Sequence, residues 1–251
     1  MKMDDAIGLL AGHFEPGAKI TVLTGAGVSA ASGVPTFRGR DGLWKNNPPE
    51  QLATPQAFER DPRLVWEWYN WRRERISSCR PNAAHEVLAA WSLRYPGFTL
   101  ITQNVDGLHE RAGTQNLIRF HGSIWEVFCW NRCAKSPARW WDETVPYSRI
   151  PPECPYCGGM LRPGVVWFGE GIDEEVLQRS IAALHCDVFM SIGTSAVVYP
   201  AAGLAAEARR RGAFTAEINP ETTAASGTLD LSIQMPAEVA LPLLEKHLCR
   251  K

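Results

Sequence analysis

The chain has 251 residues, of which 45% are hydrophobic and 21% are charged, and its formal net charge at pH 7 is −1. A chain of this size can bury one large core, and the near-zero charge removes any general electrostatic case for binding nucleic acid or an anionic membrane surface. Because no apolar run approaches the roughly 20 residues of a membrane span and the N-terminus lacks a signal-peptide pattern, we expect a cytoplasmic protein with no specific nucleic-acid partner and no membrane partner.

The first predicted strand leads into a glycine-rich turn. Asp4 is expected to cap a helix that ends near Gly17, and residues 19–23 form an apolar, β-branched run typical of a buried parallel strand. Gly25, Gly27 and Ala30 then fit the pattern G-x-G-x-x-A, in which glycine lets the backbone approach a pyrophosphate. The turn therefore predicts a phosphate site.

The loop after this turn departs from a dehydrogenase. Pro35 breaks the helix early, and no second strand with an acidic residue follows roughly 20 residues on. Instead, the loop carries Phe37 and Arg38, which we expect to reach the nicotinamide end of a dinucleotide.

The middle of the chain predicts helices and then two strands. A segment that leaves the core is expected at residues 40–60. A long helix rich in aromatic residues is predicted to begin at Asp61 and Pro62 and to run to residue 76, and another helix is predicted at residues 82–95. The strand at 98–102 ends in a polar cluster that begins with Gln103, and the strand at 117–120 ends at His121. Since ligands bind at the carboxyl ends of parallel strands, both ends are candidate sites.

Two polar groups at these ends suit catalysis. Imidazole titrates near neutrality, so His121 is a candidate general base, and Gly122 beside it leaves room for a ligand. Asn104 is placed to hydrogen-bond a ribose or position water, although Asn104 and Asp106 could simply cap a helix that begins near Gly107.

After residue 164 the chain alternates again between helices and strands. Helices are predicted from Asp173, from Pro200 and after Pro236, and strands at residues 187–192, 213–218 and 231–233. This alternation is typical of a doubly wound parallel sheet. We expect residues 193–195 to face the adenylate or a phosphate, and residues 217–219 to hold the adenosine ribose.

The cysteines indicate a metal site. Cys129, Cys133, Cys154 and Cys157 have the pair spacing of a ribbon-type zinc site, and four thiolates leave no open position on a tetrahedral ion. The zinc should therefore be structural, with one ion per chain. Cys79, Cys186 and Cys249 are expected to be free thiols without a role.

Taken together, these motifs closely resemble the sirtuins, the NAD-dependent protein lysine deacylases. The ordered set comprises residues 25–29, 35–38, 103–106, 121–122, the four cysteines, 166–170, 193–195 and 219–221. Two departures from the family pattern are small: Ala30 and Ala31 stand where many members have an acid, and the first cysteine pair is one residue wider than usual.

The resemblance implies an α/β fold. A Rossmann-like doubly wound parallel sheet would be formed by residues 1–38, 85–123 and 165–251. A smaller region would consist of a helical insertion at 39–84 and a zinc-binding module at 124–164, with NAD and the acyl-lysine meeting in the cleft between the two parts.

The resemblance also implies the reaction and its residues. The acyl oxygen attacks the ribose carbon that carries nicotinamide, and nicotinamide leaves. His121 as general base activates a ribose hydroxyl that attacks the acyl-imidate, and water then releases free lysine and O-acyl-ADP-ribose. His121 and Asn104 would be catalytic. The residues implied to bind NAD are Gly25, Ala26, Gly27, Ser29, Ala30, Phe37, Arg38, Trp44, Gln103, Asn104, Val105, Asp106, Gly193, Thr194, Ser195, Asn219, Pro220, Glu221 and Ala237.

The type of acyl group that the enzyme removes is indicated by Tyr69 and Arg72. From spacing alone they are a helical i,i+3 pair on one face, and a surface role is the plainer interpretation. The resemblance favours another, because Tyr-x-x-Arg is similar to the signature of the class III subgroup that removes succinyl and malonyl groups, with residual deacetylation. The residues implied to bind substrate are Ala53, Tyr69, Arg72, Val166, Trp167, Phe168 and Gly169.

Other functions stay open at this point. A dehydrogenase would explain neither the missing acidic residue nor Phe37 and Arg38, and a non-enzymatic zinc-ribbon adaptor would leave the polar strand ends without a purpose. An enzyme that is mainly a deacetylase, or ADP-ribosyl transfer at the same site, fits the same residues.

Overall fold

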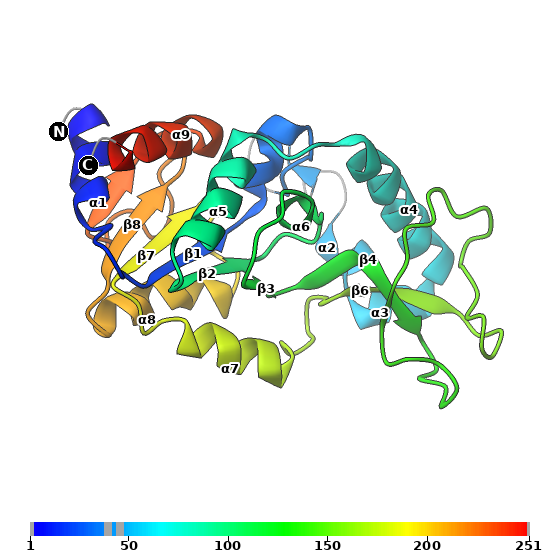
Figure 1. Cartoon of the computed structure of the whole chain (residues 1–251). Coiled ribbons are helices and arrows are strands. Elements are labelled where there is room, and N and C mark those ends of the chain that lie inside the picture. The colour runs from blue at the N-terminus through cyan, green and yellow to red at the C-terminus, as the bar shows by residue number, and fades with distance from the viewer. Residues whose placement is uncertain (1–2, 38–41, 44–47, 250–251) are drawn as a thin grey trace.

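A parallel sheet of six strands in the order β3-β2-β1-β7-β8-β9 forms one end of the molecule (Figure 1). The computed structural model describes residues 3–37, 42–43 and 48–249. The strands are β1 (Ile20–Thr24), β2 (Phe98–Thr102), β3 (Leu117–Arg119), β7 (Val188–Ile192), β8 (Phe214–Ile218) and β9 (Leu231–Ile233). Because β1 pairs with both β2 and β7, the strand order reverses beside it, and ligands of such sheets bind outside the carboxyl ends at that reversal.

Helices cover both faces of this sheet. On one face lie α1 (Met3–Gly12), α5 (Ala83–Arg94) and α9 (Ala237–Leu248), and on the other lie α7 (Glu174–Ala182), the short η3 (Ala201–Gly203) and α8 (Leu204–Arg210) (Figure 1). Since side chains alternate along a strand, Val22 and Leu100 enter the first core, whereas Leu23 and Ile101 enter the second. The predicted doubly wound fold is confirmed.

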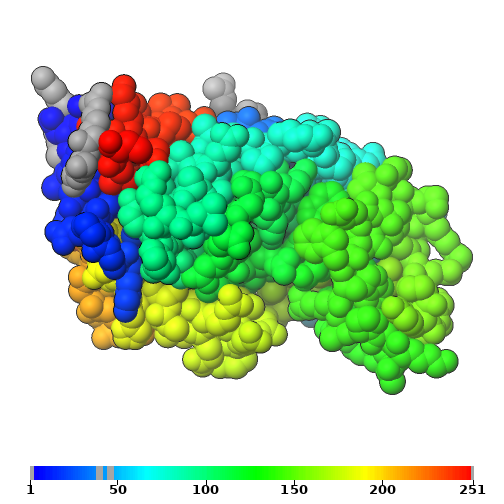
Figure 2. Space-filling view, in the orientation of Figure 1, coloured from blue at the N-terminus to red at the C-terminus, as the bar shows by residue number. Residues whose placement is uncertain are grey.

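The remaining elements form a smaller lobe with a core of its own. It contains the antiparallel sheet β5-β4-β6 and three helices, namely β4 (Gly122–Cys129), β5 (Trp140–Trp141), β6 (Leu161–Val165), α2 (Pro49–Leu52), α3 (Pro55–Arg60) and α4 (Pro62–Ser78). The space-filling view shows this lobe at the end of the molecule opposite α1 (Figure 2). None of the helices in the described part of the chain is both long and apolar enough to span a bilayer.

Several element boundaries differ from the sequence prediction. The first helix ends at Gly12 instead of near Gly17, and the turn after β1 continues as the 3-10 helix η1 (Ala26–Ser32), which Gly33 ends in a left-handed conformation. The segment expected as an excursion contains α2 and α3, because Thr54 accepts a hydrogen bond from the Ala57 amide and caps α3. The helix predicted near Gly107 is the single turn α6 (Leu108–Arg111).

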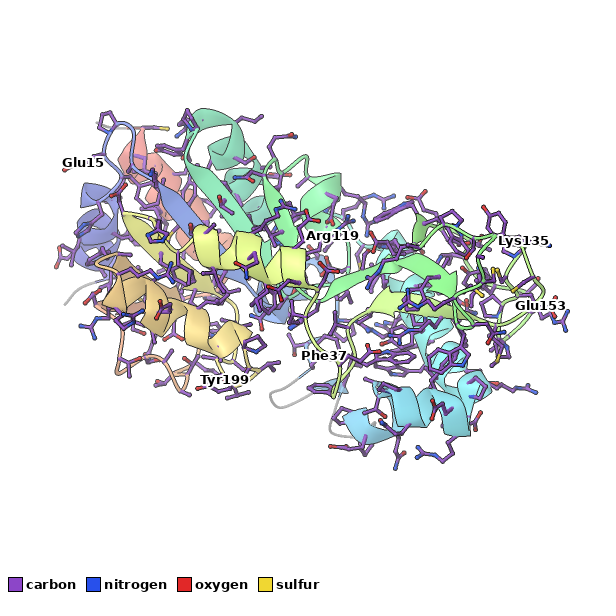
Figure 3. The ribbon with its side chains drawn as sticks, turned by 90° about the horizontal axis from the view of Figure 1, so that it is seen from below. Glu15, Phe37, Arg119, Lys135, Glu153 and Tyr199 are labelled. Carbon is purple, nitrogen blue, oxygen red and sulfur yellow. The ribbon has the colours of Figure 1, made fainter. Side chains whose placement is uncertain are left out.

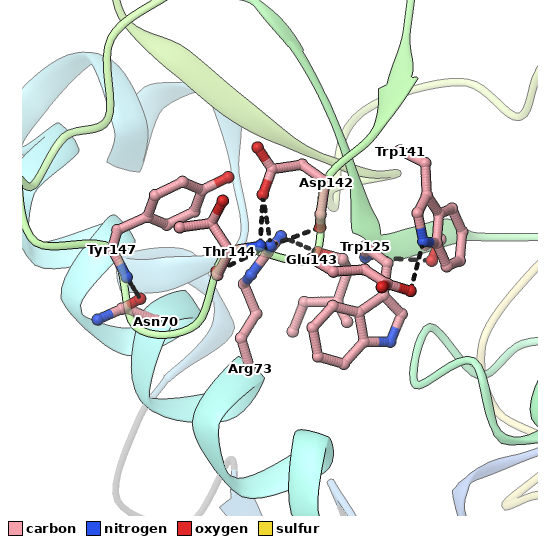
Figure 4. Close-up of polar contacts among 10 residues, drawn as sticks. Asn70, Arg73, Trp125, Trp141, Asp142, Glu143, Thr144 and Tyr147 are labelled. Carbon is pink, nitrogen blue, oxygen red and sulfur yellow. Dashed lines mark hydrogen bonds and ion pairs between the residues drawn. The ribbon is translucent and has the colours of Figure 1, made fainter.

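Arg73 joins α4 to the antiparallel sheet (Figure 4). Its guanidinium is fully buried, donates hydrogen bonds to the carbonyls of Ile124 and Thr144, and pairs with the Asp142 carboxylate at 3.0 Å. It also lies about 5 Å from the ring centroid of Trp125. Arg72, the preceding residue of α4, lies on a different side of the helix. By anchoring α4 to the sheet, Arg73 therefore also fixes the orientation of Arg72.

Replacing Arg73 by methionine is therefore expected to lower the free energy of unfolding by roughly 2–4 kcal/mol, because several buried acceptors lose their donor. Urea denaturation would measure the change. Arg75→Met is the matched control, since Arg75 is an exposed residue of the same helix and should cost under about 0.5 kcal/mol. Equal losses in the two variants would show that Arg73 does not hold the two elements together.

Candidate active site

A cavity of about 960 Å³ lies where the carboxyl ends of the sheet meet the smaller lobe. Figure 3 shows Phe37 at this junction, seen from below. The predicted residues that line the cavity are Gly25, Ala26, Gly27, Ala30, Phe37, Ala53, Tyr69, Arg72, Gln103, Asn104, Val105, His121, Val166, Trp167, Phe168, Gly169, Gly193, Thr194, Ser195, Asn219, Pro220 and Glu221. Segments far apart in sequence therefore meet at one site.

Five other predicted positions are not on the cavity wall or cannot be placed. Ser29 and Asp106 are buried behind the wall, and Ala237 packs into the core at the start of α9. Arg38 and Trp44 lie outside the described residues.

Two glycine turns pack against each other at the reversal of strand order. The Gly27 amide donates to the Gly193 carbonyl at 2.8 Å, and a Cβ on Gly25 would lie 2.8 Å from that carbonyl oxygen. Gly193 has a φ of +61°, and a Cβ there would lie 2.5 Å from the Val28 amide nitrogen. The contact therefore requires glycine, and it holds the backbone of both turns at the cavity wall.

A buried polar network supports Asn104 from behind the first turn. The Ser29 hydroxyl donates to the Asp106 carboxylate at 2.7 Å and accepts from the Asn104 amide at 3.2 Å. The Asn82 amide donates to Nδ1 of His85, so the ring proton lies on Nε2, 3.3 Å from the Ser29 oxygen. Burial lowers the pKa of His85 to about 4, which keeps the ring neutral. Ser29 and Asp106 thus orient Asn104 and do not face the cavity.

His121 lies on the cavity wall between β3 and β4. Its Nδ1 is 3.2 Å from the Gln103 carbonyl oxygen, and a proton on Nδ1 leaves the Nε2 lone pair free to accept a proton. Burial lowers the pKa of His121, and the hydrogen bond to Gln103 offsets part of that effect. Gly122 follows with a φ of +75°, where a Cβ would lie 2.1 Å from the Gly164 carbonyl oxygen. This geometry suits a general base.

The later strands shape the other end of the cavity. Asn219 donates to the Thr194 carbonyl at 2.8 Å, and Gln103 donates to the Thr194 hydroxyl at 3.0 Å. Glu217 does not match the prediction that it could hold a ribose. Its carboxylate is buried and accepts hydrogen bonds from Thr223, Ser226 and Ser232, so it fixes the loop that follows β8.

The four predicted zinc ligands come together at the far end of the smaller lobe. The sulfur atoms of Cys129, Cys133, Cys154 and Cys157 all lie within 4.8 Å of one another. Cys129 Sγ is 3.6 Å from Cys157 Sγ, and Cys133 Sγ is 4.0 Å from Cys154 Sγ. A tetrahedral ion with Zn–S bonds of about 2.3 Å needs sulfurs about 3.8 Å apart, so the cluster fits one zinc ion.

Comparison with known proteins identifies the family. The model of the Sir2 family matches residues 25–200. The NAD-dependent protein deacylase of Aquifex aeolicus is 48% identical over 233 residues, which cover 92% of this chain and 96% of that protein. This chain belongs to the Sir2 family.

Solved Sir2 structures support the same assignment. A Sir2 homologue in complex with NAD has a TM-score of 0.85 and 43% identity, covering 99% of this chain and 93% of that one. A Sir2 complex with a p53 peptide and NAD⁺ has a TM-score of 0.81 and 29% identity, covering 98% of both chains. The predicted family, enzyme class and fold, and the predictions of NAD and zinc, are confirmed.

The Sir2 cleft contains a buried cation at one end. Arg72 is 5% exposed and lies 4.9 Å from the Phe37 ring centroid and 4.8 Å from that of Trp68. Within the described part of the chain, its guanidinium donates no hydrogen bond and forms no ion pair. Burial lowers the pKa of Arg72, and Tyr69 and Asp106 only partly compensate. The helical pair is therefore not a surface contact.

Sequence reasoning missed further residues of the Sir2 cleft. They are Thr36, Trp68, Val165, Glu170, Gly171, Ile172, Leu177, Val198, Tyr199, Pro200, Thr222, Thr223, Pro236 and Glu238. Thr36 and Glu170 lie inside the motifs at 35–38 and 166–170, and most of the others lie within two residues of a predicted motif or site residue. Leu177 carries no such signal, because apolar residues of a predicted helix are normally assigned to the core.

Proposed function

We propose that this Sir2 enzyme is an NAD-dependent protein lysine deacylase that prefers acidic acyl groups, succinyl and malonyl, to acetyl. The observation that carries the proposal is the buried guanidinium of Arg72, which has no anionic partner among the residues that the structure describes. A buried cation is costly unless an anion and hydrogen bonds compensate it. The distal carboxylate of a succinyl-lysine would supply both.

The surroundings of Arg72 support a carboxylate. Asp106, the described acid that acts on its charge, is already bonded to the Ser29 hydroxyl and the Leu108 amide. Tyr69, on the same face of α4, brings a second polar group to the cavity wall. A guanidinium can bind a carboxylate through two parallel hydrogen bonds, and a phenol can add a third. Neutral acetyl-lysine offers no charge to these donors.

The placement of the other residues supports the reaction that we propose. NAD supplies an electrophilic ribose carbon, from which the acyl oxygen displaces nicotinamide. His121 accepts the proton of a ribose hydroxyl through Nε2, so that this hydroxyl can attack the acyl carbon. Asn104, held by Ser29, orients the ribose. Water then adds to the acyl carbon and the lysine amine leaves, so that the products are nicotinamide, deacylated lysine and O-acyl-ADP-ribose.

We propose the remaining roles on the same basis. The turns at Gly25 and Gly193 and the strand end at Asn219 would hold NAD, whereas Ala53 and residues 166–169 would line the acyl-lysine channel. We also propose a division into a sheet domain, a helical insertion at residues 39–84 and a zinc module at residues 124–164. The protein partners would be acyl-lysine proteins or peptides.

Replacing Arg72 by methionine tests the acyl preference. The variant should lose roughly 10- to 100-fold in kcat/KM for succinyl-lysine peptides, mainly through KM, because a charged hydrogen-bonded pair is lost. Acetyl-lysine peptides should lose much less. Steady-state assays that follow nicotinamide release and deacylated peptide by mass would measure both.

Arg75→Met, which removes an exposed cation from the same helix, controls for net charge. If Arg72→Met weakens both substrates equally, the acidic preference must be abandoned in favour of a deacetylase. Transfer of ADP-ribose to protein without deacylated peptide would support the alternative activity at this site.

A further inference from the structure

Trp167 forms a hydrogen bond that bears directly on the acyl pocket. Its indole Nε1 donates to the Tyr69 hydroxyl oxygen at 2.9 Å, and both side chains are at least 98% buried. The Tyr69 hydroxyl donates to no described residue. Because the indole occupies one side of the oxygen as a donor, the phenolic hydrogen must point elsewhere. Tyr69 lines the cavity, so an acceptor bound in the cavity is the partner that we consider for this hydrogen.

The Trp167 indole is also held by contacts other than its hydrogen bond to Tyr69. Arg162, on β6, stacks over the Trp167 ring with its guanidinium carbon 3.5 Å from the ring centroid. Arg162 pairs through two hydrogen bonds with Glu170, and the Glu170 carboxylate also accepts from the Trp167 amide at 2.8 Å. Burial alone would raise the pKa of Glu170, but these hydrogen bonds lower it, so the carboxylate stays ionised. Backbone and ring of Trp167 are therefore both fixed.

The Tyr69 hydroxyl is also in the right protonation state to donate a hydrogen bond. Burial raises the pKa of Tyr69, so the phenol keeps its hydrogen throughout the neutral range. A protonated phenol can give its hydrogen bond only to an acceptor. An ionised acyl carboxylate beside Arg72 would be the strongest acceptor to enter this part of the cavity.

We propose that Trp167 is a positioning residue for acyl selectivity, whose indole N–H turns the Tyr69 hydroxyl into a donor aimed at the distal carboxylate of the acyl group. The inference rests on the proposed function and deepens it. Arg72 supplies a positive charge for the acyl carboxylate, whereas Trp167, acting through Tyr69, sets the direction of the phenolic hydrogen bond. The enzyme then selects acidic acyl groups by two independent means.

The test is the substitution Trp167→Phe, which keeps an aromatic ring under Arg162 and removes the N–H. The ratio of kcat/KM for succinyl-lysine to that for acetyl-lysine peptides should fall roughly three- to tenfold, because a donor that is no longer oriented loses part of its hydrogen bond to the charged group. Tyr69→Phe should lower the ratio at least as much. The double variant should be no worse than Tyr69→Phe, since Trp167 acts through that hydroxyl.

Trp66→Phe is the matched control for loss of a buried indole hydrogen bond. The Trp66 indole donates to the Leu161 carbonyl at 2.7 Å, in the same lobe, and its side chain is not on the cavity wall. This variant should lose some stability but keep the wild-type selectivity ratio. A thermal melt of each variant would verify that the protein folds.

The outcomes separate the two proposals. If Arg72→Met lowers the selectivity ratio and Trp167→Phe does not, the proposed function holds and the role of Trp167 is wrong. Additive effects of Trp167→Phe and Tyr69→Phe would also overturn it, because the two residues would then act separately. If the wild-type enzyme shows no preference for succinyl-lysine, the proposed function itself fails first.

Discussion

Replacing His121 by alanine should nearly abolish deacylation, with a loss in kcat of roughly 10²- to 10⁴-fold, because the variant lacks the proposed general base. The fold should persist, since within the described part of the chain the side chain of His121 makes one hydrogen bond, to the Gln103 carbonyl. NAD binding should change little, because the base acts in the chemical step. Rates of O-acyl-ADP-ribose formation and calorimetric NAD titration would measure the two effects.

The pH profile gives an independent check on the same residue. Because burial lowers the pKa of His121, the neutral, base-competent form predominates at and above the ordinary value of 6.5. The acidic limb of kcat/KM should therefore lie below pH 6.5 and vanish from the residual activity of His121→Ala. A limb centred above that value, or near-wild-type turnover by the variant, would remove His121 from the role of base.

His85→Gln is a useful control, because His85 is a buried histidine of the same sheet domain that lies behind the cavity wall. It should weaken the support of Asn104 through Ser29 without shifting the acidic limb. The roles of His121 and His85 would thus be distinguished by the shape of the pH–rate profile and not by the size of the rate loss.

Loss of zinc should be the second large effect. Cys154→Ser, or treatment with a strong chelator, is expected to unfold the small antiparallel sheet, because structural zinc binding contributes on the order of 10 kcal/mol to folding. Activity should fall with it, since β6 carries Arg162 and leads into the loop at Trp167 on the cavity wall. Metal analysis, far-UV circular dichroism and deacylation assays would follow the three changes together.

Cys249→Ser is the matched control, because Cys249 is a free, exposed cysteine outside the cluster. It should bind one zinc ion per chain and retain full activity. A cysteine-intact protein purified without chelator that contains no zinc would contradict the assignment, as would a Cys154→Ser variant with wild-type metal content.

The sequence by itself determined most of the elements. Strands at residues 98–102 and 231–233 were predicted with their observed bounds, and Asp61 and Asn82 were placed at the starts of the helices that they cap. These signals are local, because alternation, β-branching and capping act over a few residues. Cysteine spacing was equally informative, since four thiolates in two close pairs have few alternatives to a zinc site.

The tertiary structure decided what each polar group does. Glu217 lies near the end of β8, as Asn219 does, yet it is bonded to two hydroxyls of the following loop and to Ser232 on β9, and Ser29 and Asp106 face each other behind the turn. Arg72 could be recognised as a buried cation without a described anionic partner, and the Trp167 indole as the donor to Tyr69, only after residues about 100 positions apart had packed together. Local sequence sets which groups reach the edge of the sheet, but their partners come from distant segments, so long-range packing decides whether a side chain supports the site or faces its ligand.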